Sequence, residues 1–336
     1  MERILKNILV TGGAGFIGAN FLHYLAKIGF KGRVVNLDSL TYAGDLDNIK
    51  GIENKINYRF VKGDIRDSNL LQTIFEEEKF DTVVHFAAES HVDNSIKGPK
   101  IFLETNVIGT YELLATAKNF WEKNQNISSG VLFHHISTDE VYGSLGETGY
   151  FTEDTPYDPS SPYSASKASS DHFVMAYHRT YNLPVTISNC SNNYGPFQNK
   201  EKLIPLMITN AISGNKLPVY GDGKNIRDWL YVEDHCDAIW AILQKGETGR
   251  TYNIGGNNEW KNIDIVKYIC KVLGNLTENP VQYYENLISY VNDRPGHDRR
   301  YAIDSSRIQK EINWFPKETF ETGIEKTVRF YLKNIN

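Results

Sequence analysis

Short runs of aliphatic and β-branched residues alternate with longer amphipathic segments through the first half of the chain. The apolar runs predict strands at residues 7–11, 33–38, 57–62, 82–87, 131–137 and 184–189. Between them, apolar positions recur with helical spacing at residues 15–28, 67–77, 99–123 and 164–181. Buried strands that alternate with helices are typical of a parallel sheet covered on both faces. The pattern therefore predicts an α/β fold with a doubly wound parallel sheet.

From about residue 190 the alternation loosens. Helical spacing continues at residues 203–213, 232–244, 262–273, 305–311 and 321–332, separated by turns rich in glycine and asparagine. Because no flexible linker or low-complexity tract precedes this part, we expect it to pack directly on the sheet. The predicted organisation is a nucleotide-binding domain over residues 1–190 and a smaller mixed α/β substrate-binding domain over residues 191–336. This prediction allows the chain to pass from the second domain back into the first.

Composition and charge narrow the class of protein. The chain is 40% hydrophobic and 23% charged, as in ordinary globular domains. Its net charge of -5 argues against nucleic acid as a partner, and no apolar run reaches the length of a membrane span. The N-terminal segment lacks the apolar core of a signal peptide, and the three scattered cysteines predict no disulfide framework. We expect a cytoplasmic protein.

A glycine-rich turn follows the first predicted strand. Gly12, Gly15 and Gly18 form a G-x-x-G-x-x-G pattern that allows close approach of a pyrophosphate to the amides of a helix N-terminus. The second strand ends in Asp38, where a carboxylate accepts hydrogen bonds from ribose hydroxyls and repels a 2′-phosphate. Its spacing favours this role over that of a turn residue. Asp64, after the third strand, is a further candidate near an adenine. These features predict a Rossmann-type sheet that binds NAD rather than NADP.

Tyr163 and Lys167 stand four residues apart, just after Pro162. A helix that begins at this proline places both side chains on one face. We predict that the ammonium group of Lys167 lowers the pKa of Tyr163 from about 10, so that the phenol serves as a general base toward an alcohol. Tyr58 and Lys62 share the spacing but lie on a predicted strand. Only the first pair therefore has a catalytic context.

Two adjacent carboxylates, Asp139 and Glu140, follow the fifth predicted strand and Thr138. Like charges this close raise each other's pKa. Successive strand residues point to opposite faces, so both acids reach one ligand only if the strand ends before them. The residues alone fit either a solvated turn or a working acid–base pair. His134 and His135 lie within the same strand and are predicted to point apart as packing or hydrogen-bonding residues, not as metal ligands.

These motifs resemble the extended short-chain dehydrogenase/reductase family, and within it the sugar-nucleotide dehydratases that act on dTDP-glucose. The resemblance covers essentially the whole chain and is weakest at residues 275–290. It rests on six segments in order: 38–44 (DSLTYAG), 86–93 (FAAESHVD), 137–143 (STDEVYG), 189–196 (NCSNNYGP), 201–205 (EKLIP) and 294–301 (RPGHDRRY). It implies tightly bound NAD, regenerated in each turnover, and a homodimer formed through the helices at 99–123 and 164–181. A deoxysugar pathway, such as that of rhamnose, is the expected setting.

The resemblance also assigns residues to the two ligands. Besides the three loop glycines, NAD is expected to contact Phe16, Ile17, Asp38, Ser39, Leu40, Thr41, Asp64, Ile65, Ala87, Ala88, Glu89, Ser90, Thr105, Tyr163, Lys167 and Asn193. The sugar nucleotide is expected to contact Ser90, Thr138, Asn192, Lys202, Leu203, Pro218, Val219, Tyr220, Arg227, Asn262, Asp293, Arg294, Pro295, Gly296 and His297. Lys202 and Arg227 would hold the diphosphate, with a surface ion pair as the alternative for each.

The implied reaction removes water from dTDP-glucose and gives dTDP-4-keto-6-deoxyglucose without net redox change. Tyr163 takes the proton of the carbon-4 hydroxyl while hydride passes to NAD, and Thr138 bonds the carbon-4 oxygen. Glu140 removes the hydrogen of carbon 5, Asp139 protonates the departing carbon-6 hydroxyl, and hydride returns to carbon 6. We predict that Asp139 becomes a useful acid mainly when substrate buries it, against an opposing effect of Lys167.

Two alternatives remain. Another NAD-dependent sugar-nucleotide enzyme, such as a 4-epimerase, a decarboxylase or a dehydratase of UDP- or CDP-sugars, also needs Thr138, Tyr163 and Lys167. An epimerase or decarboxylase has no need of the pair Asp139 and Glu140 for eliminating a carbon-6 hydroxyl. A non-catalytic NAD-binding sensor has no use for an activated tyrosine.

Overall fold

The centre of the computed structural model, which describes residues 2–124, 130–293 and 298–334, is a seven-stranded sheet in the order β10-β6-β5-β4-β1-β2-β3. All neighbouring strands run parallel. Their bounds are β1 (Asn7–Thr11), β2 (Arg33–Asp38), β3 (Asn57–Lys62), β4 (Thr82–His85), β5 (Leu132–Thr138), β6 (Val185–Cys190) and β10 (Arg250–Ile254). The six strands predicted in the first half are confirmed.

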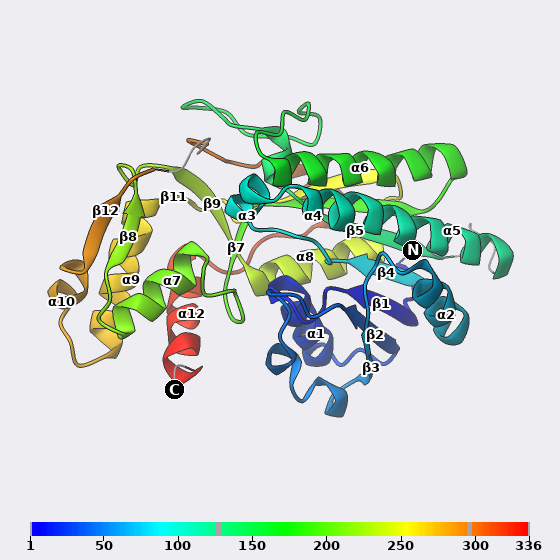
Figure 1. Cartoon of the computed structure of the whole chain (residues 1–336), viewed down its shortest axis with the longest axis horizontal. Helices are drawn as coiled ribbons and strands as arrows, with labels where there is room; N and C mark the ends of the chain where they lie inside the picture. The colour runs from blue at the N-terminus through cyan, green and yellow to red at the C-terminus, as the bar shows by residue number, and fades with distance from the viewer. Residues whose placement is uncertain (1, 125–129, 294–297, 335–336) are drawn as a thin grey trace.

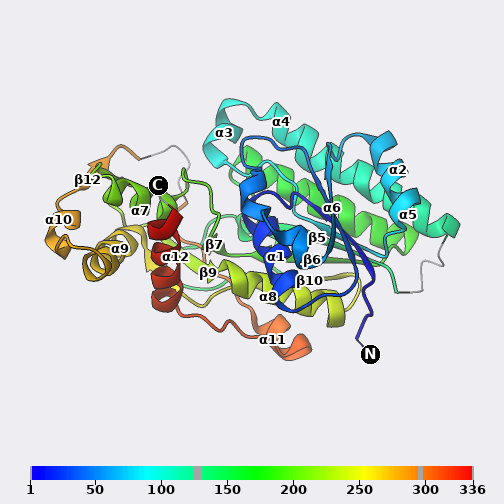
Figure 2. The ribbon, with the colours of Figure 1, turned by 90° about the horizontal axis from the view of Figure 1, so that it is seen from below.

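Helices cover both faces of this sheet, as Figures 1 and 2 show. One face packs against α1 (Phe16–Lys27) and α8 (Val232–Lys245), and the other against α2 (Ser68–Glu78), α5 (Thr110–Asn124) and α6 (Pro162–Tyr181). Because both faces are buried, central strands such as β5 consist entirely of buried residues. The predicted doubly wound α/β architecture is confirmed.

The outermost strand beside β6 comes from the second half of the chain. β10 pairs in parallel with β6, and α8, which precedes it, packs against α1. The sheet therefore contains residues from both sides of position 190. The division into domains at that position stays a prediction.

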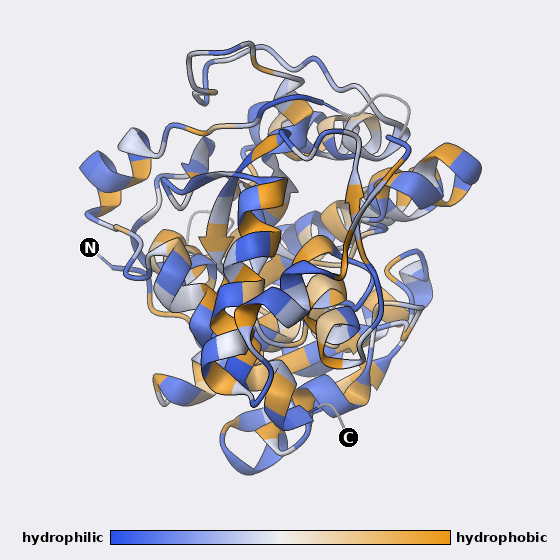
Figure 3. Ribbon diagram, turned by 90° about the vertical axis from the view of Figure 1, so that its left-hand side faces the viewer, coloured by the Kyte–Doolittle hydropathy of each residue, from blue (hydrophilic) through white to orange (hydrophobic). Residues whose placement is uncertain are grey.

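The remaining part forms a second layer beside the sheet (left in Figure 1). It contains a three-stranded sheet, a two-stranded sheet and helices around an aromatic core that includes Tyr194, Trp229 and Phe320. The strands are β7 (Asn192–Tyr194), β9 (Ile226–Tyr231), β11 (Glu259–Lys261), β8 (Leu217–Tyr220) and β12 (Ile288–Val291). The helices are α7 (Leu203–Ile212), α9 (Asn262–Leu276), α10 (Val281–Glu285) and α12 (Phe320–Asn334). The remaining helix, α11 (Ser306–Ile312), packs instead against β10 and α8 of the main sheet. Hydrophobic and hydrophilic positions alternate along the helices in Figure 3, as expected where one face of each is buried.

The segment predicted as one helix at 99–123 is continuous but irregular. It consists of α4 (Lys100–Phe102), a π-helical stretch η3 (Leu103–Gly109) and α5. Within the stretch, the Asn106 side chain accepts a hydrogen bond from Glu89 N and donates to Glu89 O and Ser166 Oγ. Short elements at α3 (Val92–Lys97), η1 (Leu46–Ile49) and η2 (Ile52–Asn54) were not predicted. None of the helices in the described part of the chain combines the length and apolar character needed to cross a membrane.

Candidate active site

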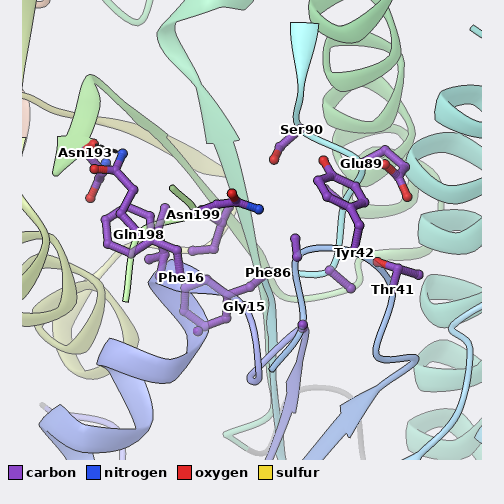
Figure 4. Close-up of a pocket in the computed structure, with 18 of the residues that line it drawn as sticks. Gly15, Phe16, Thr41, Tyr42, Phe86, Glu89, Ser90, Asn193, Gln198 and Asn199 are labelled. Atoms are coloured by element: carbon purple, nitrogen blue, oxygen red, sulfur yellow. Dashed lines mark hydrogen bonds between the residues drawn. The ribbon is translucent and has the colours of Figure 1, made fainter. Parts of the chain in front are cut away.

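A cavity of about 830 Å³ lies at the carboxyl ends of the sheet strands. This edge is where ligands bind in open α/β sheets. Its walls are formed by the glycine turn after β1, the loops that follow β2, β3, β4 and β5, and the segment 190–202. Figure 4 shows Tyr42, Glu89 and Ser90 on one side of the cavity, and Asn193 and Gln198 on the other.

The glycine turn is built for close backbone packing. Gly12 has φ +73°, and a Cβ at this position would lie 2.7 Å from backbone atoms of Ala87. No side chain among the described residues caps Gly15, where α1 begins. The first amides of α1 are therefore available to a phosphate at the cavity wall.

The carboxylate at the end of β2 is held rigidly. Asp38 Oδ2 accepts a hydrogen bond from Ala14 N at 2.9 Å, and Oδ1 accepts one from Leu40 N at 2.8 Å. Each oxygen keeps a second lone pair for a ribose hydroxyl. At the end of β3, the Arg66 guanidinium donates to Asp64 Oδ2 at 2.7 Å and keeps the pKa of that carboxyl below its usual range. The glycine turn and these acids fit an adenine dinucleotide without a 2′-phosphate.

All of the predicted NAD-contacting residues except Leu40 line this cavity. Leu40 has φ +55° and packs against the hydrophobic core beside α1, so its side chain is directed away from the site. The lining set is Gly12, Gly15, Phe16, Ile17, Gly18, Asp38, Ser39, Thr41, Asp64, Ile65, Ala87, Ala88, Glu89, Ser90, Thr105, Tyr163, Lys167 and Asn193.

The adjacent acids both reach the cavity because β5 ends immediately before them. The strand stops at Thr138, and Asp139 starts the 3₁₀ turn η4 (Asp139–Tyr142). Thr138 Oγ1 accepts a hydrogen bond from Glu140 N at 3.3 Å and fixes this turn. Thr138, Asp139 and Glu140 all line the cavity. Both acids can reach one ligand only if the strand ends before them, and the structure confirms that it does.

Asp139 is already buried by the protein itself, with 2% of its surface exposed. Burial raises the pKa of this carboxyl well above its usual range, and the charges of Glu140 and Asp228 raise it further. The positive charge of Arg227 and a hydrogen bond from Thr138 oppose the shift. The prediction that substrate is needed to bury Asp139 is therefore wrong, and the opposing cation is Arg227 rather than Lys167.

Tyr163 and Lys167 lie in the first turns of α6. Ser161 and Ser164 form a capping box around Pro162, which fixes the start of the helix and puts both side chains at the cavity wall. Lys167 Nζ donates to Ile136 O at 2.8 Å. Burial lowers the pKa of Lys167 to about 8.

The predicted lowering of the Tyr163 pKa is wrong for this structure. Burial raises the pKa of the phenol well above its ordinary value, and the nearby charge of Glu140 adds to the shift. A hydrogen bond with Thr138 acts in the opposite direction. The helical spacing predicted that Lys167 lies beside Tyr163. It could not predict that the Tyr163 phenol is buried or that Glu140 lies nearby.

The predicted sugar-nucleotide residues divide into two groups. Ser90, Thr138, Asn192 and Lys202 line the cavity, and Lys202 Nζ donates to Ser90 O at 3.3 Å. The other described members lie in the second region, outside the lining of this cavity: Leu203, Pro218, Val219, Tyr220, Arg227, Asn262 and Asp293. Val219 is buried in the core there. Arg294, Pro295, Gly296 and His297 fall outside the described residues.

Arg227 occupies β9 and is buried. Its guanidinium donates to the carbonyls of Ile226 and Asp298 at 2.8 Å each and lies 4.2 Å from the centre of the Tyr301 ring. It also acts electrostatically on Asp139. Arg227 is therefore a residue of the second region whose charge lowers the pKa of Asp139.

Several residues that line the cavity were not predicted. Tyr42 and Glu201 lie inside the segments that carried the resemblance, so the signal for them was present. The loop that contains Phe197, Gln198 and Asn199 has no such signal and is positioned by tertiary contacts. Its Gln198 carbonyl accepts a hydrogen bond from Tyr331 of α12 at 2.7 Å.

A sequence model of the GDP-mannose 4,6-dehydratase family matches residues 9–327. The chain belongs to this family. A probable dTDP-glucose 4,6-dehydratase of Sinorhizobium fredii is 56% identical over 97% of this chain and 93% of its own length.

Solved structures agree with this family assignment. A dTDP-glucose 4,6-dehydratase of Bacillus anthracis in complex with NAD has a TM-score of 0.87 at 50% identity, covering 98% of this chain and 97% of that one. A UDP-glucose 4-epimerase of Thermotoga maritima has a TM-score of 0.85 at 27% identity, covering 98% of this chain and all (100%) of that one. The family fold is thus shared by dehydratases and epimerases, and the residues of the site must separate the two activities.

Proposed function

We propose that the chain dehydrates dTDP-glucose to dTDP-4-keto-6-deoxyglucose with bound NAD. The observation that carries this proposal is the pair Asp139 and Glu140 on a turn that directs both into the NAD-type cavity, beside Thr138 and Tyr163. The relatives named above, a probable dTDP-glucose 4,6-dehydratase and an NAD-bound dTDP-glucose 4,6-dehydratase, support the same reaction.

Tyr163 is proposed to accept the proton of the carbon-4 hydroxyl. When bound, NAD supplies a positively charged ring that accepts a hydride and later returns it. Lys167 supports the phenolate with its ammonium charge, and Thr138 bonds the carbon-4 oxygen. Because burial favours the neutral phenol, these positive and hydrogen-bonding neighbours are needed to stabilise the phenolate form of Tyr163, which is the form that accepts the proton.

Glu140 and Asp139 are proposed to carry out the elimination. The carbon-4 ketone acidifies the hydrogen on carbon 5, which Glu140 removes. Asp139 gives its proton to the departing carbon-6 hydroxyl, so that water leaves. Because burial raises the pKa of Asp139, this carboxyl keeps its proton to a higher pH than an exposed aspartate does.

A 4-epimerase is the main competing function. The similarity to the UDP-glucose 4-epimerase shows the same fold, and Thr138, Tyr163 and Lys167 serve that reaction as well. An epimerase leaves the carbon-6 hydroxyl in place and has no use for a buried, protonated acid beside it. The burial of Asp139 therefore favours the dehydratase.

One assay separates these functions. The purified protein is incubated with dTDP-glucose and no added NAD, and the product is identified by NMR and mass spectrometry. A 4-keto-6-deoxy sugar is expected. A 4-epimer would identify an epimerase, and turnover of UDP- or CDP-glucose alone would change the substrate assignment. No turnover of any of these sugars would favour a sensor.

We also propose a homodimer through the α5 and α6 side of the molecule. Leu103, Ile108 and Tyr111 are exposed along η3 and α5, and Phe173 and Tyr181 are exposed on neighbouring α6. Exposed apolar patches of this kind mark interaction sites. Sedimentation equilibrium is expected to give twice the chain mass, and Leu103→Glu is expected to give the monomer mass. A monomeric wild type would contradict the proposal.

The proposed location is the cytoplasm. Cys190, Cys236 and Cys270 are buried free thiols, which is the usual state in a reducing compartment. Fractionation of the source cells is expected to recover the protein with cytoplasmic markers.

A further inference from the structure

A third ionisable residue continues the catalytic face of α6. Asp171 follows Lys167 by four residues, as Lys167 follows Tyr163, so the three side chains lie along one face of the helix. Asp171 is buried, with 1% of its surface exposed. Its Oδ2 accepts hydrogen bonds from Ser137 Oγ at 2.8 Å and from Tyr157 OH at 3.0 Å. These donors hold the carboxylate in a fixed position behind Lys167.

The other oxygen of Asp171 and the ammonium group of Lys167 meet at the same nitrogen of one imidazole, where Ser170 Oγ also lies at 3.2 Å. Asp171 Oδ1 lies 3.2 Å from His135 Nε2, and Lys167 Nζ lies 3.3 Å from the same nitrogen. Oδ1 has no hydrogen-bond partner among the described residues. Burial lowers the pKa of His135 well below its usual range, so the ring is neutral and carries no charge of its own.

Lys167 has few sources of compensating negative charge. On α6 itself it is faced by Tyr163, which is a neutral phenol, and by Asp171. From the sheet it is faced by His85 of β4, His135 of β5 and Cys190 of β6. Both imidazoles are neutral, and burial raises the pKa of the Cys190 thiol to about 12. Burial raises the pKa of Asp139, just after β5, well above its usual range. Burial also raises the pKa of Asp171, to about 6, and the charge of Lys167 opposes this shift, so above that pH Asp171 supplies a negative charge near the buried ammonium.

We propose that Asp171 is a positioning residue that keeps Lys167 as an ammonium group beside Tyr163, through the negative charge that it holds next to the same nitrogen of His135. This inference deepens the proposed function and rests on the role given there to Tyr163 and Lys167. An isolated ammonium in this buried site would lose its proton to avoid the cost of desolvation. With a pKa of about 8, Lys167 is close to that limit even in the presence of Asp171.

The test compares Asp171→Asn with wild-type holoenzyme over a range of pH. The first readout is the rate at which dTDP-glucose reduces the bound NAD in a single turnover. At alkaline pH the rate is expected to fall as Lys167 loses its proton; this fall is the alkaline limb of the pH profile. In the variant the alkaline limb should lie about one pH unit or more lower, because a nearby opposite charge shifts the pKa of a group such as Lys167 by about 1–3 units. Substrate KM is expected to change less than about twofold, since Asp171 does not line the cavity.

The second readout is the pKa of Lys167 itself. It is measured from the Lys167 side-chain signal in ¹³C-lysine-labelled holoenzyme, assigned with Lys167→Arg. We expect this pKa to be lower in Asp171→Asn than in wild type. This measurement needs no turnover, so it separates a failure of the present proposal from a failure of the proposed function. An unchanged Lys167 pKa overturns the proposal.

Control variants separate charge from packing. Tyr157→Phe removes one hydrogen bond to Asp171 but keeps its charge, and Asp171→Glu keeps a carboxylate; both are expected to retain the wild-type alkaline limb to within about half a unit. A shift in these variants as large as in Asp171→Asn would mean that packing alone is responsible. If Asp171→Asn does not fold, Asp171→Ser, which puts a smaller neutral residue at this position, replaces it in both measurements. Its alkaline limb should then move down, and an unmoved limb overturns the proposal.

Discussion

Replacing Asp139 by asparagine is expected to stabilise the folded protein at neutral pH while it slows elimination. Burial raises the pKa of this carboxyl well above its usual range and so favours its neutral form. Each pH unit over which the folded protein keeps a proton that the unfolded chain has lost corresponds to about 1.4 kcal/mol of lost stability. Asparagine has nothing to ionise, so the variant is free of this cost. It also has no proton to donate, and the loss of a general acid is expected to slow elimination by about 10²–10⁴.

Part of the gain is offset locally. Asp139 Oδ2 is buried and has no hydrogen-bond partner among the described residues. If the new amide nitrogen takes that position, an unpaired donor costs about 1–3 kcal/mol. The free energy of unfolding at pH 7 therefore rises in the variant when the proton retained by wild type costs more than this local loss of about 1–3 kcal/mol. A carboxyl whose pKa is raised by folding loses stability as the pH rises from its unfolded value, so the advantage of the variant should shrink by about 1.4 kcal/mol for each unit that the pH is lowered from 7 to 5.

The assay is urea unfolding of wild type and Asp139→Asn, followed by circular dichroism at pH 5, 6, 7 and 8 under identical conditions. Glu78→Gln is the matched control, because Arg33 keeps the pKa of Glu78 below its usual range. That variant should be less stable than wild type at pH 7, with a difference that shrinks as the pH falls toward the Glu78 pKa. An Asp139→Asn protein that is no more stable than wild type at pH 7, or whose advantage is independent of pH, would refute the reasoning about Asp139.

Three further outcomes follow from the same site. Glu140→Gln is expected to leave oxidation at carbon 4 intact but to stop removal of the carbon-5 hydrogen, so reduced cofactor should accumulate in its absorbance band after substrate is added; an unchanged product yield would contradict the base role. Gly12→Ala places a Cβ 2.7 Å from the Ala87 backbone at φ +73°, and it is expected to lose bound NAD on desalting and to be destabilised by at least about 1 kcal/mol. Asp38→Ala is expected to weaken NAD retention about tenfold or more, measured as the cofactor content after dialysis. Retention equal to that of wild type would contradict the proposal that Asp38 binds the ribose.

The local pattern of apolar and polar residues was sufficient to predict the main sheet and the helices that cover it. The strands at Asn7–Thr11, Arg33–Asp38 and Asn57–Lys62 match their predicted bounds. The first two are largely buried runs that end at a glycine or acidic turn, whereas the third lies at the edge of the sheet, is only partly buried and is marked by tyrosine, phenylalanine and valine before a glycine. The motifs likewise placed the glycine turn, Asp38 and the pair Tyr163 and Lys167 at one cavity, since the carboxyl ends of parallel strands share one edge.

The second region was less accessible to sequence reasoning. Strands such as β7 (Asn192–Tyr194) and β11 (Glu259–Lys261) have three residues each, too few for a periodic signal. The pairing of β10 with β6 joins segments that are far apart in the chain, and no local pattern encodes it. Leu40 illustrates the same limit on a smaller scale, because its left-handed backbone turns the side chain from the cavity into the core.

The sequence by itself determined which chemical groups this protein has and in what order: a phosphate turn, a ribose acid, two adjacent carboxylates, and a tyrosine with a lysine one helical turn away. Only the tertiary structure decided their protonation states. Burial and charges from distant segments raise the pKa of Asp139 and of Tyr163, and burial raises the pKa of Asp171 to about 6. The physical reason is that a pKa depends on desolvation and on charges within several ångströms, and both are set by residues that meet only when the chain has folded.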